Sequence, residues 1–147
     1  MSHPTHSPAD FEQVIQLLTH SFAEMESKAL QESGLAELSM RQVVCLDVID
    51  RLERPTFSEL AAQLGVSKPS VTALVARLLA KGYVERAPDP SDRRVSHVLL
   101  TSKGRGLSQA HQNFHRKIAQ HFAGVLDAEE LGQLGRLLYK AVKAGQG

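Results

Sequence analysis

Apolar residues recur at helical spacing in six stretches of this chain, and most of these stretches begin at a recognisable capping signal. A serine or threonine followed three residues later by glutamine or glutamate forms a capping box, which satisfies the free backbone N–H groups at a helix start. Ser39 and Thr56 begin such boxes. Together with the apolar spacing, the capping signals predict helices that start near residues 8, 40, 57, 68, 102 and 128.

Between the fourth and fifth predicted helices the apolar period changes from helical to alternating. Residues 84–86 and 95–100 fit two short strands, and the turn-forming sequence Asp-Pro-Ser-Asp at 89–92 lies between them. A helix, a tight turn at Gly65, a second helix and a hairpin with a basic tip follow one another over residues 56–101. That order is typical of a winged helix-turn-helix.

We therefore predict a mainly α fold with a small β-hairpin wing, in a single domain over residues 1–147 whose winged lobe is 38–101. The first, fifth and sixth helices carry more apolar surface than a lone winged helix requires, so residues 8–36 and 102–145 are expected to form a dimerisation region. The alternative is that they close the core of a monomer. In the fifth helix the apolar seam has heptad spacing at Leu107, His111, Phe114, Ile118, His121 and Val125.

Composition excludes several classes of protein. The longest apolar runs are far shorter than the roughly 18 residues of a membrane span, so no membrane partner is expected. The first eight residues have neither the basic nor the apolar region of a secretory signal, and we expect a disordered leader there. The one cysteine, Cys45, excludes an internal disulfide and fits the cytoplasm.

The charges are segregated along the chain although the net charge is only +1. Residues 66–105 contain eight basic and three acidic side chains, whereas residues 8–65 contain four basic and ten acidic ones. A basic region beside an acidic one is the electrostatic pattern expected of a protein that binds a phosphate backbone. The alternative is chance clustering of charges on solvated faces.

The helix predicted after Ser67 has small and hydroxylated side chains opposite its apolar face. Such a face can enter the major groove of DNA, and the N-terminus of the helix favours phosphate oxygens. Arginines at the hairpin tip fit the narrow minor groove, and we expect the Asp92 carboxylate to hold the Arg94 guanidinium. Alternatively, these residues only cap a surface helix and solvate a loop. The predicted DNA-binding residues are Ser67, Lys68, Pro69, Ser70, Thr72, Ala73, Arg77, Asp92, Arg93 and Arg94.

Taken together, residues 11–143 resemble the MarR family of transcriptional regulators. The most specific matches are residues 58–61, 71–72, 77–78, 81–86 and 92–94. The resemblance implies a symmetric homodimer that binds a palindromic operator in double-stranded DNA, with half-sites about 10 base pairs apart or a multiple of that. It also implies a sequence-specific repressor that is released by a small-molecule effector.

The resemblance places an effector between the dimerisation helices and the winged lobe. Candidate residues for that pocket are Phe22, Val44, Cys45 and His111, although no residue set identifies a ligand. Cys45 lies among valines and a leucine, so we predict a buried and unreactive thiol rather than an oxidant sensor.

A zinc-responsive regulator of the same fold is the first alternative. His111 and His115 are four residues apart, so both imidazoles can lie on one helix face and share a metal. Glu26 resembles a third ligand of zinc-sensing members, but Val44 stands where those members have a histidine. The ligand set is therefore incomplete, and no metal or other cofactor is predicted.

Two further classes of function are weighed against DNA binding. An enzyme is not expected, because the chain has no glycine-rich phosphate loop or nucleophile elbow, and Gln112 replaces the general-base glutamate of a zinc-protease helix. A winged helix used only for protein contact is the other alternative. DNA binding through several phosphates weakens steeply with salt, and protein docking predicts no such slope.

Overall fold

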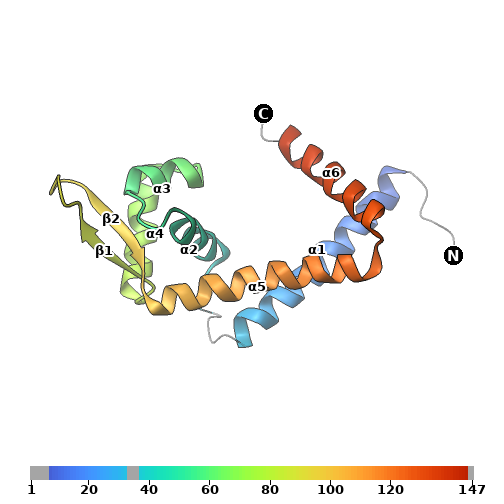
Figure 1. Ribbon diagram of the computed structural model, residues 1–147, viewed down its shortest axis with the longest axis horizontal. Coiled ribbons are helices and arrows are strands. Elements are labelled where there is room, and N and C mark those ends of the chain that lie inside the picture. The colour runs from blue at the N-terminus through green and yellow to red at the C-terminus, as the bar shows by residue number, and fades with distance from the viewer. Residues whose placement is uncertain (1–6, 33–36, 146–147) are drawn as a thin grey trace. The chain divides into compact units, whose positions relative to one another are not determined.

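The computed structural model describes residues 7–32 and 37–145, and the mainly helical fold with a two-stranded wing is confirmed (Figure 1). The expected leader before residue 7, and residues 33–36 of the expected dimerisation region, lie outside the described residues. The chain divides into two compact units, Met1–His111 and Gln112–Gly147. The elements are α1 (Pro8–Glu32), α2 (Met40–Leu52), α3 (Phe57–Leu64), α4 (Lys68–Ala80), β1 (Val84–Pro88), β2 (Ser96–Leu100), α5 (Ser102–Val125) and α6 (Ala128–Ala144).

The helices begin where the capping signals predict them. In α2 and α3 the hydroxyls of Ser39 and Thr56 accept the backbone N–H three residues on, and the side chain at that position accepts the N–H of the cap. Asp127 forms a third capping box at α6. Helix α3 ends at Gly65, whose φ of 63° is left-handed, a conformation that glycine adopts without steric cost.

The core of the first unit lies among α2, α3, α4, the hairpin and the start of α5. Tyr83, which connects α4 to the wing, is fully buried and donates from its hydroxyl to Glu37 at 3.1 Å. Helices α2 to α5 and strand β2 each contribute large aliphatic side chains that are completely buried. These are Leu46, Ile49, Leu60, Leu78, Val98 and Leu107. The winged lobe is therefore held by contacts within one chain.

The wing is an antiparallel pair in which Val84 faces Leu100 and Pro88 faces Ser96. The first strand is two residues longer than predicted, and the second begins one residue later. A two-stranded hairpin is marginally stable alone, so its attachment to the lobe matters. The Val98 N–H donates to the Pro55 carbonyl at 2.9 Å, and Thr56 and His97 form an isolated antiparallel bridge.

Gly104 allows the start of α5 to pass close to the end of α4. A Cβ atom at this position would lie 2.1 Å from the Tyr83 carbonyl oxygen, so no other residue fits without a backbone shift. The same carbonyl accepts the Thr101 N–H at 3.1 Å, and the Thr101 hydroxyl accepts the Gly104 N–H. Thr101 therefore caps α5.

The terminal helices are exposed within the single chain. No described side chain of α1 or α6 is buried, and Leu17 and Leu137 are 69% and 65% exposed. The heptad seam of α5 is buried at Leu107 and exposed at Val125. None of the described helices is long and apolar enough to cross a membrane.

Candidate nucleic-acid interface

Helix α4 presents the predicted face to solvent. Its N-cap, Ser67, accepts the Ser70 N–H at 3.3 Å, and the two hydroxyls are 2.9 Å apart. The Thr72 hydroxyl donates to the Lys68 carbonyl at 3.0 Å, so it keeps a lone pair for another donor. Val71, Val75 and Leu78 are buried, while all ten predicted DNA-binding residues are exposed.

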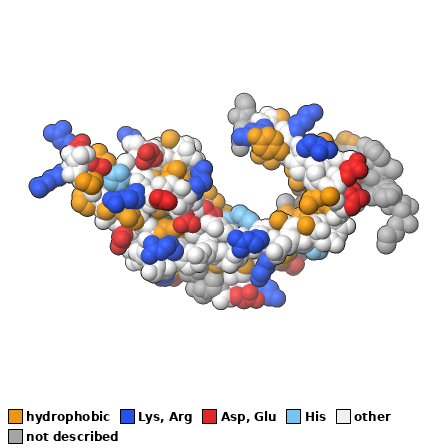
Figure 2. Space-filling view, in the orientation of Figure 1, with side chains coloured by type: hydrophobic (Ala, Val, Ile, Leu, Met, Phe, Trp, Pro, Cys, Tyr) orange, Lys and Arg blue, Asp and Glu red, His pale blue; other side chains and the backbone are white. Residues whose placement is uncertain are grey.

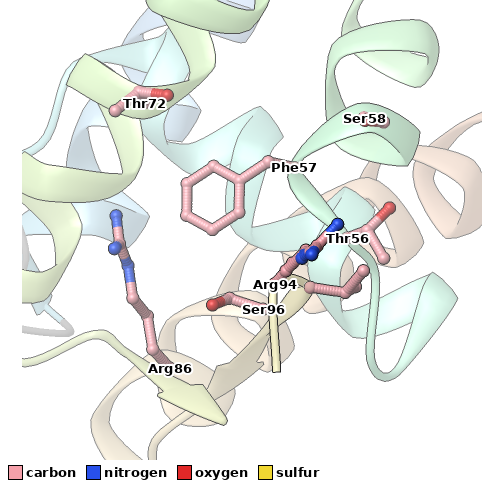
Figure 3. Close-up of a pocket in the computed structure, with 8 residues that line it drawn as sticks. Thr56, Phe57, Ser58, Thr72, Arg86, Arg94 and Ser96 are labelled. Carbon is pink, nitrogen blue, oxygen red and sulfur yellow. The ribbon is translucent and has the colours of Figure 1, made fainter. Parts of the chain in front are cut away.

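A hollow of about 370 Å³ separates the exposed face of α4 from the wing (Figure 3). It has two guanidinium groups, those of Arg86 and Arg94, and hydroxyl groups from α3, α4 and β2. No carboxylate lines it, so its chemistry suits an anion that accepts several hydrogen bonds. The lining residues are Thr56, Phe57, Ser58, Thr72, Arg86, Arg94, Val95 and Ser96.

Arg86 is held in this hollow by an aromatic contact. Its guanidinium carbon lies 4.7 Å from the centre of the Phe57 ring, a cation–π distance, and Figure 3 shows the two side chains as neighbours. Sequence reasoning matched Arg86 only to a family motif and gave it no role. The available signal was its position two residues after buried Val84, a strand position at which an arginine needs a partner.

The tip of the wing is organised by Asp89, another residue that sequence reasoning left without a functional role. One of its carboxylate oxygens accepts the Ser91 N–H and hydroxyl and the Asp92 N–H, at 2.7–3.0 Å. The bond from His97 to its other oxygen, followed by these three bonds, holds the pKa of Asp89 well below its usual range. Figure 2 shows basic side chains projecting from this end of the hairpin, at the left of the view.

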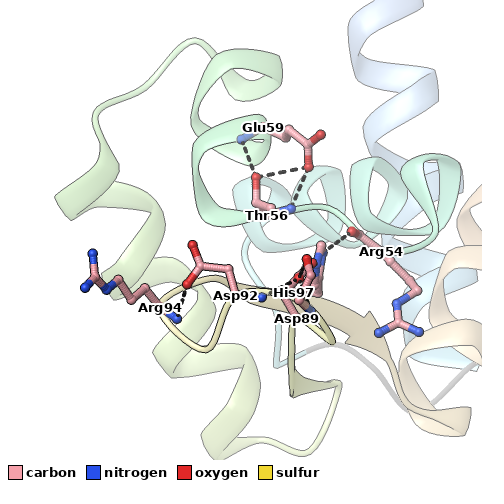
Figure 4. Close-up of polar contacts among 8 residues, drawn as sticks. Arg54, Thr56, Glu59, Asp89, Asp92, Arg94 and His97 are labelled. Carbon is pink, nitrogen blue, oxygen red and sulfur yellow. Dashed lines mark hydrogen bonds and ion pairs between the residues drawn. The ribbon is translucent and has the colours of Figure 1, made fainter.

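The expected role of Asp92 needs a correction. Its carboxylate accepts the backbone N–H of Arg94 at 2.9 Å, so it shapes the turn instead of holding the guanidinium (Figure 4). The short span between the two residues explains the difference, because an aspartate side chain readily closes a ring onto the N–H two positions later. The Arg94 guanidinium extends toward the hollow.

His97 joins the wing to the connection between α2 and α3. Its Nδ1 lies 2.7 Å from the Arg54 carbonyl oxygen and its Nε2 lies 2.8 Å from an Asp89 carboxylate oxygen (Figure 4). Both partners raise the pKa of the imidazole, Asp89 more than Arg54. At the start of α3, the backbone N–H and the hydroxyl of Thr56 donate to the Glu59 carboxylate and lower the pKa of Glu59. Nothing in the sequence around residue 97 indicates this role.

Lys68 and Arg77 do not line the hollow. Both are exposed on α4, and at 100° per residue Arg77 lies about 140° around the helix from Thr72. Of the ten predicted DNA-binding residues, the hollow brings together Thr72 and Arg94, and Arg86 lines it with them.

Two of the four candidate effector residues, Val44 and Cys45, have different surroundings. Cys45 is completely buried in the core, where desolvation raises the pKa of its thiol to about 12. Val44 is 40% exposed and instead lines an apolar groove of about 330 Å³. Adjacent helical residues point about 100° apart, which separates the two side chains. The groove is lined by Met40, Arg41, Val44, Leu64, Val66 and Leu74.

His111 has a carboxylate at each ring nitrogen. Nδ1 hydrogen-bonds to Asp47, and Nε2 lies 3.3 Å from Glu26. Because the two nitrogens are on opposite sides of the ring, these carboxylates do not surround a common point. Within residues 7–32 and 37–145, no group of three or more His, Cys, Asp or Glu side chains is arranged to hold a metal ion.

Comparison with known proteins agrees with this geometry. Residues 38–96 match the model of the MarR family. The multiple antibiotic resistance protein MarR of Salmonella typhimurium is 37% identical over 83 residues, which are 56% of this chain and 58% of that protein. The chain thus spans less than two thirds of that relative.

Two longer matches extend the likeness beyond the lobe. The HTH-type transcriptional repressor NicR of Pseudomonas putida is 29% identical over 92% of this chain and 85% of its own length. The crystal structure of Streptococcus pneumoniae FabT in complex with DNA superposes with a TM-score of 0.79 and 28% identity, covering 92% of this chain and 97% of that one. NicR is named a transcriptional repressor, and FabT was crystallised with DNA. The family likeness therefore lies in residues 38–96, which match the model of the MarR family.

Proposed function

We propose that this protein is a transcriptional regulator that binds double-stranded DNA in a sequence-specific manner. The observation that carries this function is the hollow between α4 and the wing, where Thr72, Arg86 and Arg94 come together without a carboxylate. Two arginines and several hydroxyls make a site for a backbone phosphate, and phosphate contacts fix the register of a protein on a duplex. The FabT relative was crystallised with DNA, which supports the same partner here.

In this proposal α4 reads the major groove and the wing reaches the neighbouring minor groove. The exposed face of α4 has small or hydroxylated side chains at Ser70, Thr72 and Ala73, which permit close approach to base edges. Arg93 is exposed at the tip of the wing and is the arginine placed for the minor groove, whose narrow width concentrates negative potential. Lys68, at the N-terminus of α4, adds a phosphate contact.

The regulator acts as a homodimer on a palindromic operator. Large apolar side chains are exposed on α1 and, separately, on α6, and exposed apolar faces of this kind mark interaction sites. A second copy supplies identical helices to cover them, and a two-fold dimer reads two equivalent half-sites. The exposed positions include Phe11, Leu17, Leu137, Leu138, Tyr139 and Val142.

The proposed regulator is a repressor that is released from DNA when a small molecule binds to it. NicR, which matches most of the chain, is named a repressor. The apolar groove beside Val44 includes Leu74 of α4, so a molecule bound there would press on the helix that reads DNA. A regulator that binds chromosomal DNA in this way is located in the cytoplasm. Zinc regulation through His111 and His115 stays a prediction. Among the described residues, no three metal-binding side chains are arranged to hold an ion.

Selection of bound fragments from random double-stranded DNA, followed by fluorescence anisotropy on the selected duplex, tests the proposal. We expect a palindromic motif, and an affinity that falls steeply with salt concentration because several phosphates are contacted. Absence of any enriched motif, together with a flat salt dependence, would contradict DNA reading and favour a module for protein contact.

A further inference from the structure

We propose that His97 is a proton-dependent positioning residue, which holds the wing against the connection between α2 and α3 and so sets its orientation for DNA. The three residues Arg54, Asp89 and His97 are called the wing clamp below. The inference rests on the proposed function and adds a regulation to it, namely that DNA affinity falls when the imidazolium loses its proton.

The geometry of the wing clamp requires the charged form of the ring. A carbonyl oxygen can only accept, so the Arg54 carbonyl needs a proton on Nδ1. Asp89 accepts three other hydrogen bonds on its second oxygen, which favours its ionised form and needs a proton on Nε2. A neutral imidazole has one N–H, so loss of the proton breaks one of the two bonds.

The connection that His97 holds is strained. Glu53 has φ 63° and ψ −54°, and the Arg54 N–H donates to the Leu52 carbonyl at 2.7 Å, which is a γ-turn of the rare positive-φ form. Strained backbone persists only where surrounding contacts determine it. The bond from His97 to the Arg54 carbonyl is one of those contacts, directly after the turn.

The wing clamp connects both walls of the hollow. On one side, the strained turn leads into Thr56 and Phe57, which line the hollow and support Arg86. On the other side, Asp89 fixes the tip of the wing through the backbone of Ser91 and Asp92. Losing either bond of His97 therefore lets these two walls move relative to each other.

The charged groups that face His97 favour its proton. Asp89 on the wing and the carbonyl of Arg54 raise the pKa of His97, with the Arg54 guanidinium acting weakly in the opposite direction. Glu59, at the first turn of α3, is electrostatically coupled to His97. Because the folded pKa is raised, the wing clamp is complete below the ordinary histidine pKa and is lost as pH rises through the raised value.

Anisotropy titrations of the selected duplex from about pH 6 to about pH 8.5, at fixed salt, test the inference. We expect the affinity of the wild-type protein to fall by roughly three- to tenfold over this range, and the affinity of His97→Gln to stay nearly flat, since an amide does not titrate. The matched control is His20→Gln, because His20 is 78% exposed on α1 in an ion pair with Glu24. An equal slope in wild type and His97→Gln would overturn the proposal.

A second measurement separates the wing clamp from DNA binding itself. In DNA-free protein, NMR titration should give His97 a raised pKa, which Asp89→Asn lowers, and the backbone amides of Ser91 and Asp92 should shift with the same midpoint. If the protein binds no DNA at any pH, the proposed function fails while this titration still decides the clamp. An ordinary His97 pKa, or amides that do not follow it, would refute the clamp even in a protein that binds DNA well.

Discussion

The winged lobe and the terminal helices use apolar residues in opposite ways. In the lobe, side chains such as Leu60, Val75 and Leu78 are completely buried by other parts of the same chain. In α1 and α6 no described side chain is buried, although the apolar spacing is equally regular. The lobe therefore has its core within one chain, whereas the described apolar side chains of the terminal helices are left unburied.

The difference shows which features of packing can be predicted from an apolar stripe on a helix. A stripe at helical spacing predicts that a helix will bury one face, and it does so equally well for α4 and α6. It does not tell whether the partner surface belongs to the same chain. The two regions should therefore respond differently to the same type of substitution.

The largest effect is expected from Leu60→Ala in α3. Leu60 is completely buried, so its truncation should lower the free energy of unfolding by about 2–5 kcal/mol. The matched change in the other region, Leu137→Ala, should alter it by less than about 0.5 kcal/mol in dilute protein and weaken self-association instead. Chemical denaturation and analytical ultracentrifugation measure the two effects. Equal losses of stability in both variants would erase the contrast between the regions.

Gly104→Ala tests how tightly the lobe is joined to α5. The added Cβ would lie 2.1 Å from the Tyr83 carbonyl oxygen, so we expect a loss of about 3 kcal/mol in unfolding free energy. Gly106→Ala is the control, since a Cβ there meets nothing within 4 Å and alanine favours a helix by about 1 kcal/mol. Thermal unfolding of both variants measures the difference. A stable Gly104→Ala protein would mean that the two segments separate easily.

Arg94→Ala and Arg86→Ala test whether DNA is read by the lobe alone. Each should weaken operator binding by about 1–3 kcal/mol, because both guanidiniums line the hollow. Arg116→Ala provides a control in the second unit, where the Arg116 guanidinium hydrogen-bonds to Asn113, three residues earlier on the same helix. Gel-shift titration at fixed salt gives the affinities. Full affinity in both lobe variants would remove the hollow from the mechanism.

The smallest effect is expected from Lys68→Ala, which should lower affinity alike on all DNA sequences and reduce the salt slope by about one unit. Lys68 is exposed at the N-terminus of α4, where it can meet a phosphate but is not fixed by a side-chain partner in the described structure. Lys140→Ala on α6 is the control and should leave the slope unchanged. A loss confined to the operator would show that Lys68 reads bases.

Most of the fold could be predicted because its signals are local. Capping at Ser39 and Thr56 involves residues three positions apart, and the left-handed turn at Gly65 depends on one residue. The outward face of α4 follows from helical geometry once Ser67 is its N-cap. These features need no knowledge of distant contacts, which is why the sequence alone predicted them.

The candidate site was predictable only in part, because its key contacts join distant segments. The Arg86 guanidinium meets a ring 29 residues earlier in the sequence, and His97 meets a carbonyl 43 residues earlier. The Asp92 prediction was wrong for a different reason: the pair was correctly placed, but the backbone N–H of Arg94 competes for the same carboxylate. Sequence spacing could not decide between these two donors.

Because Cys45 is buried, the reactivity of its thiol reports how often the winged lobe opens. The chain has one thiol, which is completely buried and has a pKa raised to about 12, so a thiol reagent can reach it only after the lobe opens. The labelling rate then reports how often the lobe opens, without any introduced probe. A ligand that binds only the closed lobe lowers the labelling rate of Cys45 as more of the protein becomes bound. The labelling rate can therefore be used to find molecules that the protein binds.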